Sequence, residues 1–271
     1  VTTSGKDIVF AVPVRVDEPG LTVSTGAGMG GDIDFRSSLD SQDAEYNGLS
    51  LVAGSGNIYF RSGVGRNDGG IGITTPECGP IAVSSANDVE IQGGLTTAPG
   101  GSLTITNAGI LNILDVTSDT DTAIPDLNLG GAFLQNGAGT VRISGDIKTS
   151  DATIEFDRGV TLSGDVRLDS FDAVVGADIA FYDTLTDDGS ARSVILDGGS
   201  GGSIAFSDAV GATPLGDITV QTAGSVTFSG TVNGASLIQS SGSGSTRFDG
   251  AVTLSGAADI TTTIEVDINA P

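Results

Sequence analysis

The chain has 271 residues, with 42 glycines, 34 acidic and 11 basic residues, no histidine, no tryptophan and one cysteine. Its formal charge of −23 argues against nucleic acid or membrane insertion, because anionic partners need a basic surface. The lone Cys78 excludes an intrachain disulfide, and no apolar run in the sequence approaches the roughly 20 residues of a transmembrane helix.

Short alternating runs of apolar and polar residues occur along the whole chain, and the mean hydropathy is +0.16. This pattern argues against disorder, because enough apolar surface is present to form a core. Gly, Asn, Asp and Ser separate the runs, which is typical of short β-strands. Helical periodicity is almost absent. We therefore predict an all-β protein.

A three-residue phrase, an apolar residue followed by any residue and then Phe, recurs along the chain and contains eight of the ten phenylalanines. Aliphatic residues replace Phe in the middle of the chain. The copies lie, in chain order, at residues 8–10, 33–35, 58–60, 81–83, 103–105, 127–129, 154–156, 179–181, 204–206, 226–228 and 246–248. These eleven copies are 20 to 27 residues apart, and a period in this range indicates a solenoid.

Within each copy the first and third side chains face the same way, because side chains alternate along a strand. The middle position is mostly polar or small, as expected of an outer surface. We therefore predict a single-stranded parallel β-helix (β-solenoid) of about eleven coils, continuous over residues 1–271. Its interior is expected to hold one column with two aromatic ladders. The first ladder is Phe10, Phe35 and Phe60, the second is Phe156, Phe181, Phe206, Phe228 and Phe248, and the aliphatic Val83, Ile105 and Leu129 continue the column between them. Two antiparallel sandwiches are the competing fold, but they do not explain the repeated 25-residue step.

The spacing also predicts details of individual coils. Val174 and Val175 are expected in a return strand that closes the coil begun at Ile154. Turns are expected at 211–214 and at Asn233–Gly234, each followed by a further strand. Departures from the period are the expected places for any site, namely residues 41–47, 107–151 and 186–193.

Clustered acids on predicted loops are the candidates for a metal site, because hard oxygen ligands suit Ca²⁺. They are Asp119 with Asp121, Asp187 with Asp188, and the run at 67–70. None has the spacing of an EF-hand, and none repeats as a Ca²⁺-binding nonapeptide. We therefore predict solvated turn residues and no cofactor, with Ca²⁺ as the weaker alternative.

An enzyme is the second hypothesis, because polysaccharide-cleaving enzymes also use the parallel β-helix. Asp151, Glu155 and Asp157 lie close together in the sequence. However, the absence of histidine excludes a Ser–His–Asp triad, and lysine occurs only at Lys6 and Lys148. We predict that the chain is not an enzyme. A carbohydrate-active β-helix enzyme and a Ca²⁺- or sugar-binding module are kept as alternatives.

Residues 202–239, GSIAFSDAVGATPLGDITVQTAGSVTFSGTVNGASLIQ, resemble the repeats of filamentous-hemagglutinin-like and autotransporter-type bacterial surface proteins. The resemblance is clearest over residues 150–260, is looser over 1–149, and carries over no functional residues. It implies a right-handed parallel β-helix that is secreted or lies on the cell surface. We therefore expect a non-enzymatic adhesin, stalk or filament subunit, either part of a longer chain or cut from one. The expected partners are copies of itself, further repeats of the same chain, or host and surface glycans.

Overall fold

The computed structural model describes residues 1–28, 30–41, 45–65, 78–116 and 125–269, and these residues form β-strands and connections without helices. They divide into two compact units, Val1–Thr140 (unit 1) and Val141–Pro271 (unit 2). Each unit is a parallel β-solenoid, which confirms the predicted fold class. The continuity of the solenoid over residues 1–271 stays a prediction.

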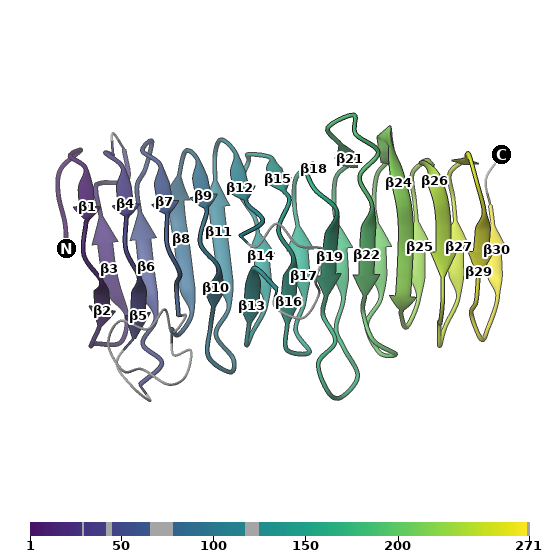
Figure 1. The fold of residues 1–271 in the computed structure, drawn as a ribbon, viewed down its shortest axis with the longest axis horizontal. Coiled ribbons are helices and arrows are strands. Elements are labelled where there is room, and N and C mark those ends of the chain that lie inside the picture. The colour runs from purple at the N-terminus through teal and green to yellow at the C-terminus, as the bar shows by residue number, and fades with distance from the viewer. Residues whose placement is uncertain (29, 42–44, 66–77, 117–124, 270–271) are drawn as a thin grey trace. The chain divides into compact units, whose positions relative to one another are not determined.

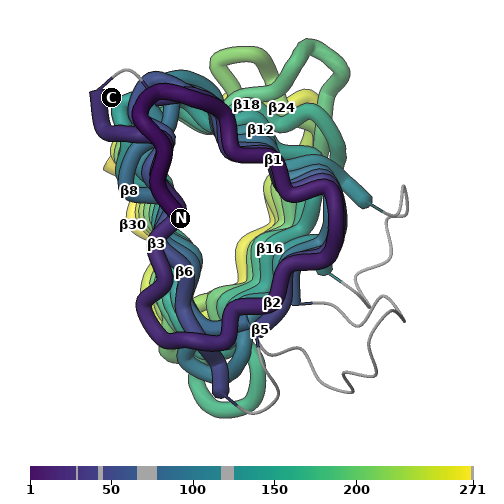
Figure 2. Tube along the Cα trace, turned by 90° about the vertical axis from the view of Figure 1, so that its left-hand side faces the viewer, coloured from purple at the N-terminus to yellow at the C-terminus, as the bar shows by residue number. Residues whose placement is uncertain are grey.

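Unit 1 is wound from three faces of parallel strands (Figure 1). The first face contains β1 (Ile8–Phe10), β4 (Ile33–Phe35), β7 (Ile58–Phe60), β9 (Val89–Ile91) and β12 (Leu111–Ile113). The second contains β2 (Val14–Val16), β5 (Leu39–Ser41), β10 (Leu95–Thr96) and β13 (Leu127–Leu129). The third contains β3 (Leu21–Ser24), β6 (Leu49–Val52), β8 (Ile81–Ala86), β11 (Leu103–Asn107) and β14 (Phe133–Gln135). Seen from its N-terminal side, the first coil runs clockwise from β1 through β2 to β3 as it recedes, so it is right-handed (Figure 2).

Unit 2 has the same three-faced plan (Figure 1). One face contains β15 (Val141–Ile143), β18 (Val160–Leu162), β21 (Leu185–Asp187) and β28 (Val252–Leu254). The next contains β16 (Ile147–Thr149), β19 (Val166–Asp169), β22 (Val194–Asp197) and β29 (Ala258–Ile260). Two long strands, β24 (Val210–Thr222) and β26 (Val232–Gln239), run through both of these faces. The remaining face contains β17 (Ile154–Phe156), β20 (Ile179–Phe181), β23 (Ile204–Phe206), β25 (Val226–Phe228), β27 (Thr246–Phe248) and β30 (Val266–Ile268).

Equivalent residues of successive coils lie directly above one another, so each core position becomes a column. In unit 2, Phe181 aligns with Phe206, and Ala180 aligns with Ala205. The rings from Phe156 to Phe248 are stacked, with centroids 4.8 to 5.2 Å apart and planes within 15° of parallel. The predicted Phe156–Phe248 part of the ladder is therefore confirmed. This column holds consecutive coils together, because each inner ring, from Phe181 to Phe228, is stacked between two others.

In unit 1 the rings of Phe10, Phe35 and Phe60 are stacked as predicted, with centroids 4.9 and 5.5 Å apart. The predicted continuation through Val83, Ile105 and Leu129 is wrong. Phe60 pairs with Ile91, 31 residues later, and Ile91 pairs with Ile113.

Val83 and Ile105 instead lie on the third face of unit 1, where they pair with each other, and Leu129 belongs to β13 on the second face. The error has a physical cause. An apolar–any–apolar triplet marks an inward-facing strand on every face of the coil. Spacing alone therefore selects the wrong strand once a longer loop changes the coil length.

The turns predicted at 211–214 and at Asn233–Gly234 lie inside β24 and β26. The register between these strands shifts between Val210 and Leu215, which marks a bulge, and Gly211 has φ of +76°. The chain thus turns a corner through this bulge, and pairing with the next coil resumes at Leu215. Glycine suits this corner, because φ in the left-handed region is costly for other residues.

Candidate functional sites

The candidate metal ligands Asp187 and Asp188 serve the connection between β21 and β22. Asp187 is buried, and its carboxylate accepts hydrogen bonds from the backbone N–H of Gly189 at 3.0 Å and of Arg192 at 2.8 Å. Asp188 forms an ion pair with Arg192 at 3.4 Å. Hydrogen bonds from Ser190 and Arg192 hold the pKa of Asp188 below its ordinary value. Asp188, exposed in the bend after β21, fits the prediction of a solvated turn residue. The prediction is wrong for Asp187, which is buried at the end of β21 because its carboxylate binds backbone N–H groups of the following turn.

The other metal candidates, Asp119 with Asp121 and the run at 67–70, lie outside the described residues. Among the residues that are described, no group of three or more His, Cys, Asp or Glu side chains is arranged to hold a metal ion. Ca²⁺ binding therefore stays the weaker alternative named above.

Many acids have a structural task that the spacing did not reveal: they accept a backbone N–H from the next coil. In unit 1 four side-chain oxygens accept such bonds, at 2.7 to 3.0 Å. The acceptor and the residue whose backbone N–H donates are Asp7 and Asp32, Asp32 and Asn57, Asn57 and Asp88, and Asp88 and Ile110. In unit 2 the carboxylates of Asp146, Asp165 and Asp178 accept the same kind of bond. The donors are the backbone N–H groups of Arg167, Ser193 and Ser203, respectively. The signal in the sequence was Asp, Asn or Ser directly before the first apolar residue of a strand.

The acids considered for an enzyme do not form one cluster. Glu155 aligns with Ala180 on the outer surface of unit 2, whereas Asp151 serves a loop described below. The exposed Tyr182 lies near this outer row. Its pKa is raised, first by the negative charge of Glu155, then by partial burial and by Asp157 and Asp178. The outer row is thus an acidic surface, and no catalytic assembly is apparent in the described residues.

Each unit has a group of arginine and aspartate side chains in which ion pairs neutralise the carboxylate charge. In unit 1 the carboxylate of Asp34 is buried between Arg36 and Arg61, with N–O distances of 2.8 and 2.7 Å. The guanidinium of Arg61 also lies 4.5 Å from the centre of the Tyr59 ring. Because one buried carboxylate is shared by arginines from successive coils, the cluster joins those coils.

In unit 2, Arg167 contacts both Asp169 and Asp197, at 3.1 and 3.2 Å, and so joins β19 to β22. Burial and the nearby charge of Asp169 raise the pKa of Asp197, although Gly199 N–H and Arg167 oppose this shift. The arrangement is a coil-to-coil contact, as in unit 1. No substrate group is needed to explain it.

Cys78 is fully buried, and burial together with the charge of Asp40 raises the pKa of its thiol to about 12. A thiol with such a pKa is almost entirely protonated at neutral pH, and the thiolate is the reactive form. Cys78 is thus a small core residue.

The β19–β20 loop, residues 170–178, was expected to contain a return strand at Val174 and Val175. The structure contradicts this: the two valines lie on a loop that extends beyond the neighbouring turns of unit 2 (Figure 1). The carboxylate of Asp151 accepts hydrogen bonds from four of its backbone N–H groups, of Asp172, Ala173, Val174 and Gly176, over 2.8 to 3.4 Å. The hydrogen bond from Gly176 is the main reason that the pKa of Asp151 is lowered.

We expect Asp151→Ala to increase amide hydrogen exchange at these four residues, because their N–H groups lose a common acceptor. The folded state has the lower pKa, so the carboxylate stabilises the loop above the pKa of the unfolded chain. This stabilisation is lost as the pH falls through the folded-state pKa. Exchange protection, corrected for intrinsic rates, should therefore decrease on acidification in the wild type and stay flat in the variant. Asp157→Ala leaves the four bonds intact and is the control; equal protection in both variants would contradict the role of Asp151.

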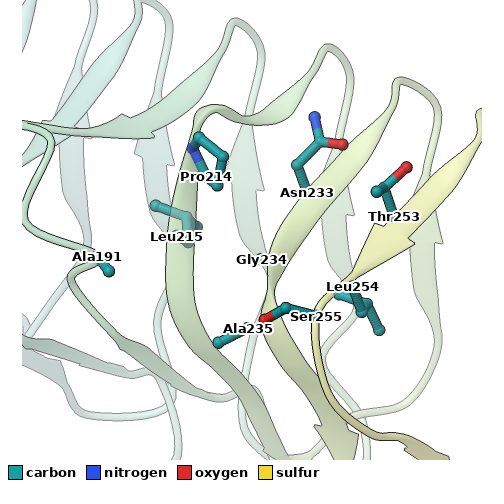
Figure 3. Close-up of a pocket in the computed structure, with 9 residues that line it drawn as sticks. All are labelled: Ala191, Pro214, Leu215, Asn233, Gly234, Ala235, Thr253, Leu254 and Ser255. Atoms are coloured by element: carbon teal, nitrogen blue, oxygen red, sulfur yellow. The ribbon is translucent and has the colours of Figure 1, made fainter.

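A shallow hollow of about 380 Å³ lies at the corner where β24 and β26 bend (Figure 3). Its nine lining residues, none of them charged, are Ala191, Pro214, Leu215, Asn233, Gly234, Ala235, Thr253, Leu254 and Ser255. Leu215, Gly234 and Leu254 align across three successive coils. Gly234 is buried, and a Cβ added there would lie 3.3 Å from Cδ1 of Ile218. We call this site the corner hollow.

Comparison with known proteins found no matching family model, no similar curated protein and no similar solved structure. The described residues form no helix that is long and apolar enough to cross a membrane.

Proposed function

We propose that the protein is a non-enzymatic, extracellular structural or adhesive β-solenoid, a stalk or filament subunit of a bacterial cell surface. One observation carries the proposal: the side chains are arranged chiefly to bind one coil to the next. The stacked phenylalanines do so inside. Outside, the carboxylate–amide bonds do so together with the ion pairs of Asp34 with two arginines and of Arg167 with two aspartates. Such repetition distributes load over many similar contacts.

The outer surface also suits a spacer that presents other groups or adheres weakly. Acids are distributed over the coils, and the middle positions of β20, β23 and β25 are Ala180, Ala205 and Thr227. A chain of net charge −23 resists nonspecific association outside its contact surfaces.

Further coils can extend the stack at β28, β29 and β30. The inward-type residues Val252, Val266 and Ile268 of these strands are 40%, 44% and 70% exposed, whereas Phe248, one coil earlier, is 5% exposed. A further parallel coil would bury these side chains and pair the open strand edges. As partners we propose copies of the chain or further repeats of the same chain.

Negative-stain electron microscopy of native material tests the proposal. We expect filaments or elongated particles, and sedimentation with a frictional ratio well above that of a sphere. Compact particles at all concentrations would contradict it. So would turnover of an acidic or neutral polysaccharide that is lost in the Glu155→Gln, Asp157→Asn double variant, because that result would favour the enzyme hypothesis.

A further inference from the structure

The chain contains three Asn–Gly pairs, Asn47–Gly48, Asn136–Gly137 and Asn233–Gly234. In such a pair the backbone nitrogen of glycine can attack the side-chain amide of the preceding asparagine, because glycine has no side chain to shield this nitrogen. The attack requires an asparagine side chain that can rotate toward the nitrogen, and a glycine N–H that is not held in a strand ladder. The three pairs differ in both respects.

The pair Asn136–Gly137 lies in the connection between β14 and β15 and meets both requirements. Asn136 is exposed. Its backbone N–H donates to the carbonyl of Ile105 at 3.0 Å, and the N–H of Gly139 donates to the carbonyl of Asn107 at 3.0 Å. Between these two bonds, the N–H of Gly137 donates to no acceptor among the described residues. Its nitrogen is therefore available to the neighbouring side chain.

The other two asparagines are held by hydrogen bonds. Asn47 is 4% exposed, and its Nδ2 donates to the carbonyl of Val16 at 3.1 Å and to the carboxylate of Glu45 at 2.9 Å. Asn233 lies within β26, which pairs with strands on both sides, and its Nδ2 donates to the carbonyl of Gly211 at 3.1 Å. Rotation of either amide toward the following nitrogen would break these bonds.

A neighbouring hydroxyl group also favours attack at Asn136. The Oγ1 of Thr106 donates to Oδ1 of Asn136 at 2.6 Å. The two residues directly follow Ile105 and Gln135, which align between β11 and β14. Negative charge develops on Oδ1 when a nitrogen attacks Cγ, and a donor that already points at this oxygen stabilises the charge.

We propose that Asn136 is a site of spontaneous deamidation. The backbone nitrogen of Gly137 loses its proton and forms a bond to Cγ of Asn136. The bond between Cγ and Nδ2 breaks, and the amide nitrogen leaves with that proton as ammonia, so that a cyclic succinimide remains. Water then adds to one of the two carbonyl carbons of the ring and opens it. The product at position 136 is aspartate or isoaspartate, depending on which carbon is attacked.

Isoaspartate would disturb the contact between coils, because it adds a carbon atom to the backbone. This turn has no space for a longer backbone. A Cβ added at Gly137 would lie 2.0 Å from the carbonyl oxygen of Asn107, and one added at Gly139 would lie 1.7 Å from that of Gly109. We therefore expect isoaspartate to break the hydrogen bonds to Ile105 and Asn107 and to loosen this turn of unit 1 with time. This inference goes beyond the proposed function and does not depend on it.

Peptide mapping by mass spectrometry tests the proposal. The folded chain is incubated at mildly alkaline pH, which favours loss of the amide proton, and each Asn–Gly peptide is followed for a gain of about 1 Da. We expect Asn136 to react at least about tenfold faster than Asn47 and Asn233. In concentrated urea the three rates should agree within about threefold, because the same dipeptide is then free of the fold.

The Thr106→Val variant provides the second measurement, because it removes the hydroxyl donor and keeps the shape of the side chain. We expect deamidation of Asn136 to slow about threefold or more, while the rate at Asn233 stays unchanged. Equal rates at the three pairs in the folded chain, or a preference for Asn136 that persists in urea, would overturn the proposal. An unchanged rate in the Thr106→Val protein would overturn the role of the hydroxyl group.

Discussion

Phe181→Ala should lower the free energy of unfolding of unit 2 by about 4 kcal/mol, because it leaves a cavity in a closely packed column. Phe181 is 1% exposed, and its ring is stacked between Phe156 and Phe206 at 5.2 and 5.0 Å. The substitution removes both stacking contacts, which add roughly 0.5–1.5 kcal/mol each to the burial term. Urea unfolding measures the loss, and hydrogen exchange should show it most strongly in β20 and the two strands that flank it.

Two companion variants separate the ladder from the surface. Phe181→Leu keeps most of the volume and should cost less than half as much as Phe181→Ala. Tyr182→Ala removes a larger side chain at the next position, but Tyr182 is 53% exposed, so the expected change is within about 0.5 kcal/mol. If Tyr182→Ala and Phe181→Ala had similar effects, the stacked column would not be the source of cohesion between coils.

Gly202→Ala should destabilise unit 2 by about 3 kcal/mol, a large effect for the addition of one methyl group. The added Cβ would lie 2.0 Å from the carbonyl oxygen of Ala177 and 2.3 Å from that of Gly198. Both atoms belong to the backbone of paired coils, so neither can move without breaking local hydrogen bonds. The same urea measurement applies, and exchange at the β19–β20 loop should also increase, because Gly202 belongs to the run that supports it.

Gly28→Ala is the matched control, since no atom lies within 4 Å of the added Cβ and φ is not in the left-handed region. The expected change is within about 0.5 kcal/mol, or a slight gain from a stiffer unfolded chain. A Gly202→Ala protein as stable as Gly28→Ala would show that the coils are not in close contact at this turn.

The recurring triplet predicted the strands well, because side-chain alternation is a local property of the backbone. Ile204 and Phe206 face inward and Ala205 outward, as the pattern required. The same locality explains the failure at Val83, since the triplet marks an inward strand on each face and cannot say which face. The turn predicted at 211–214 is a bulged corner within β24, because the register with β26 is interrupted between Val210 and Leu215.

The candidate sites depended even less on local signals. Asp188 was correctly expected in a solvated turn, whereas Asp187 is buried at the end of β21. Nothing local indicated which amides Asp151 would bind, because those amides are 21 to 25 residues away. Likewise, Val174 and Val175 read as a buried strand. In the structure the backbone of their loop packs on the glycine run 198–202, and their side chains are exposed.

The amino-acid sequence by itself determined the class of fold, the inward and outward faces of each strand and the two aromatic ladders. The reason is that the repeat period and the side-chain alternation can both be read directly along the sequence. The tertiary structure alone decided which strands pair between coils, which backbone N–H groups donate hydrogen bonds to each carboxylate, and which apolar residues are exposed. These depend on the length of each coil and on contacts between turns, and both arise only once the chain is wound.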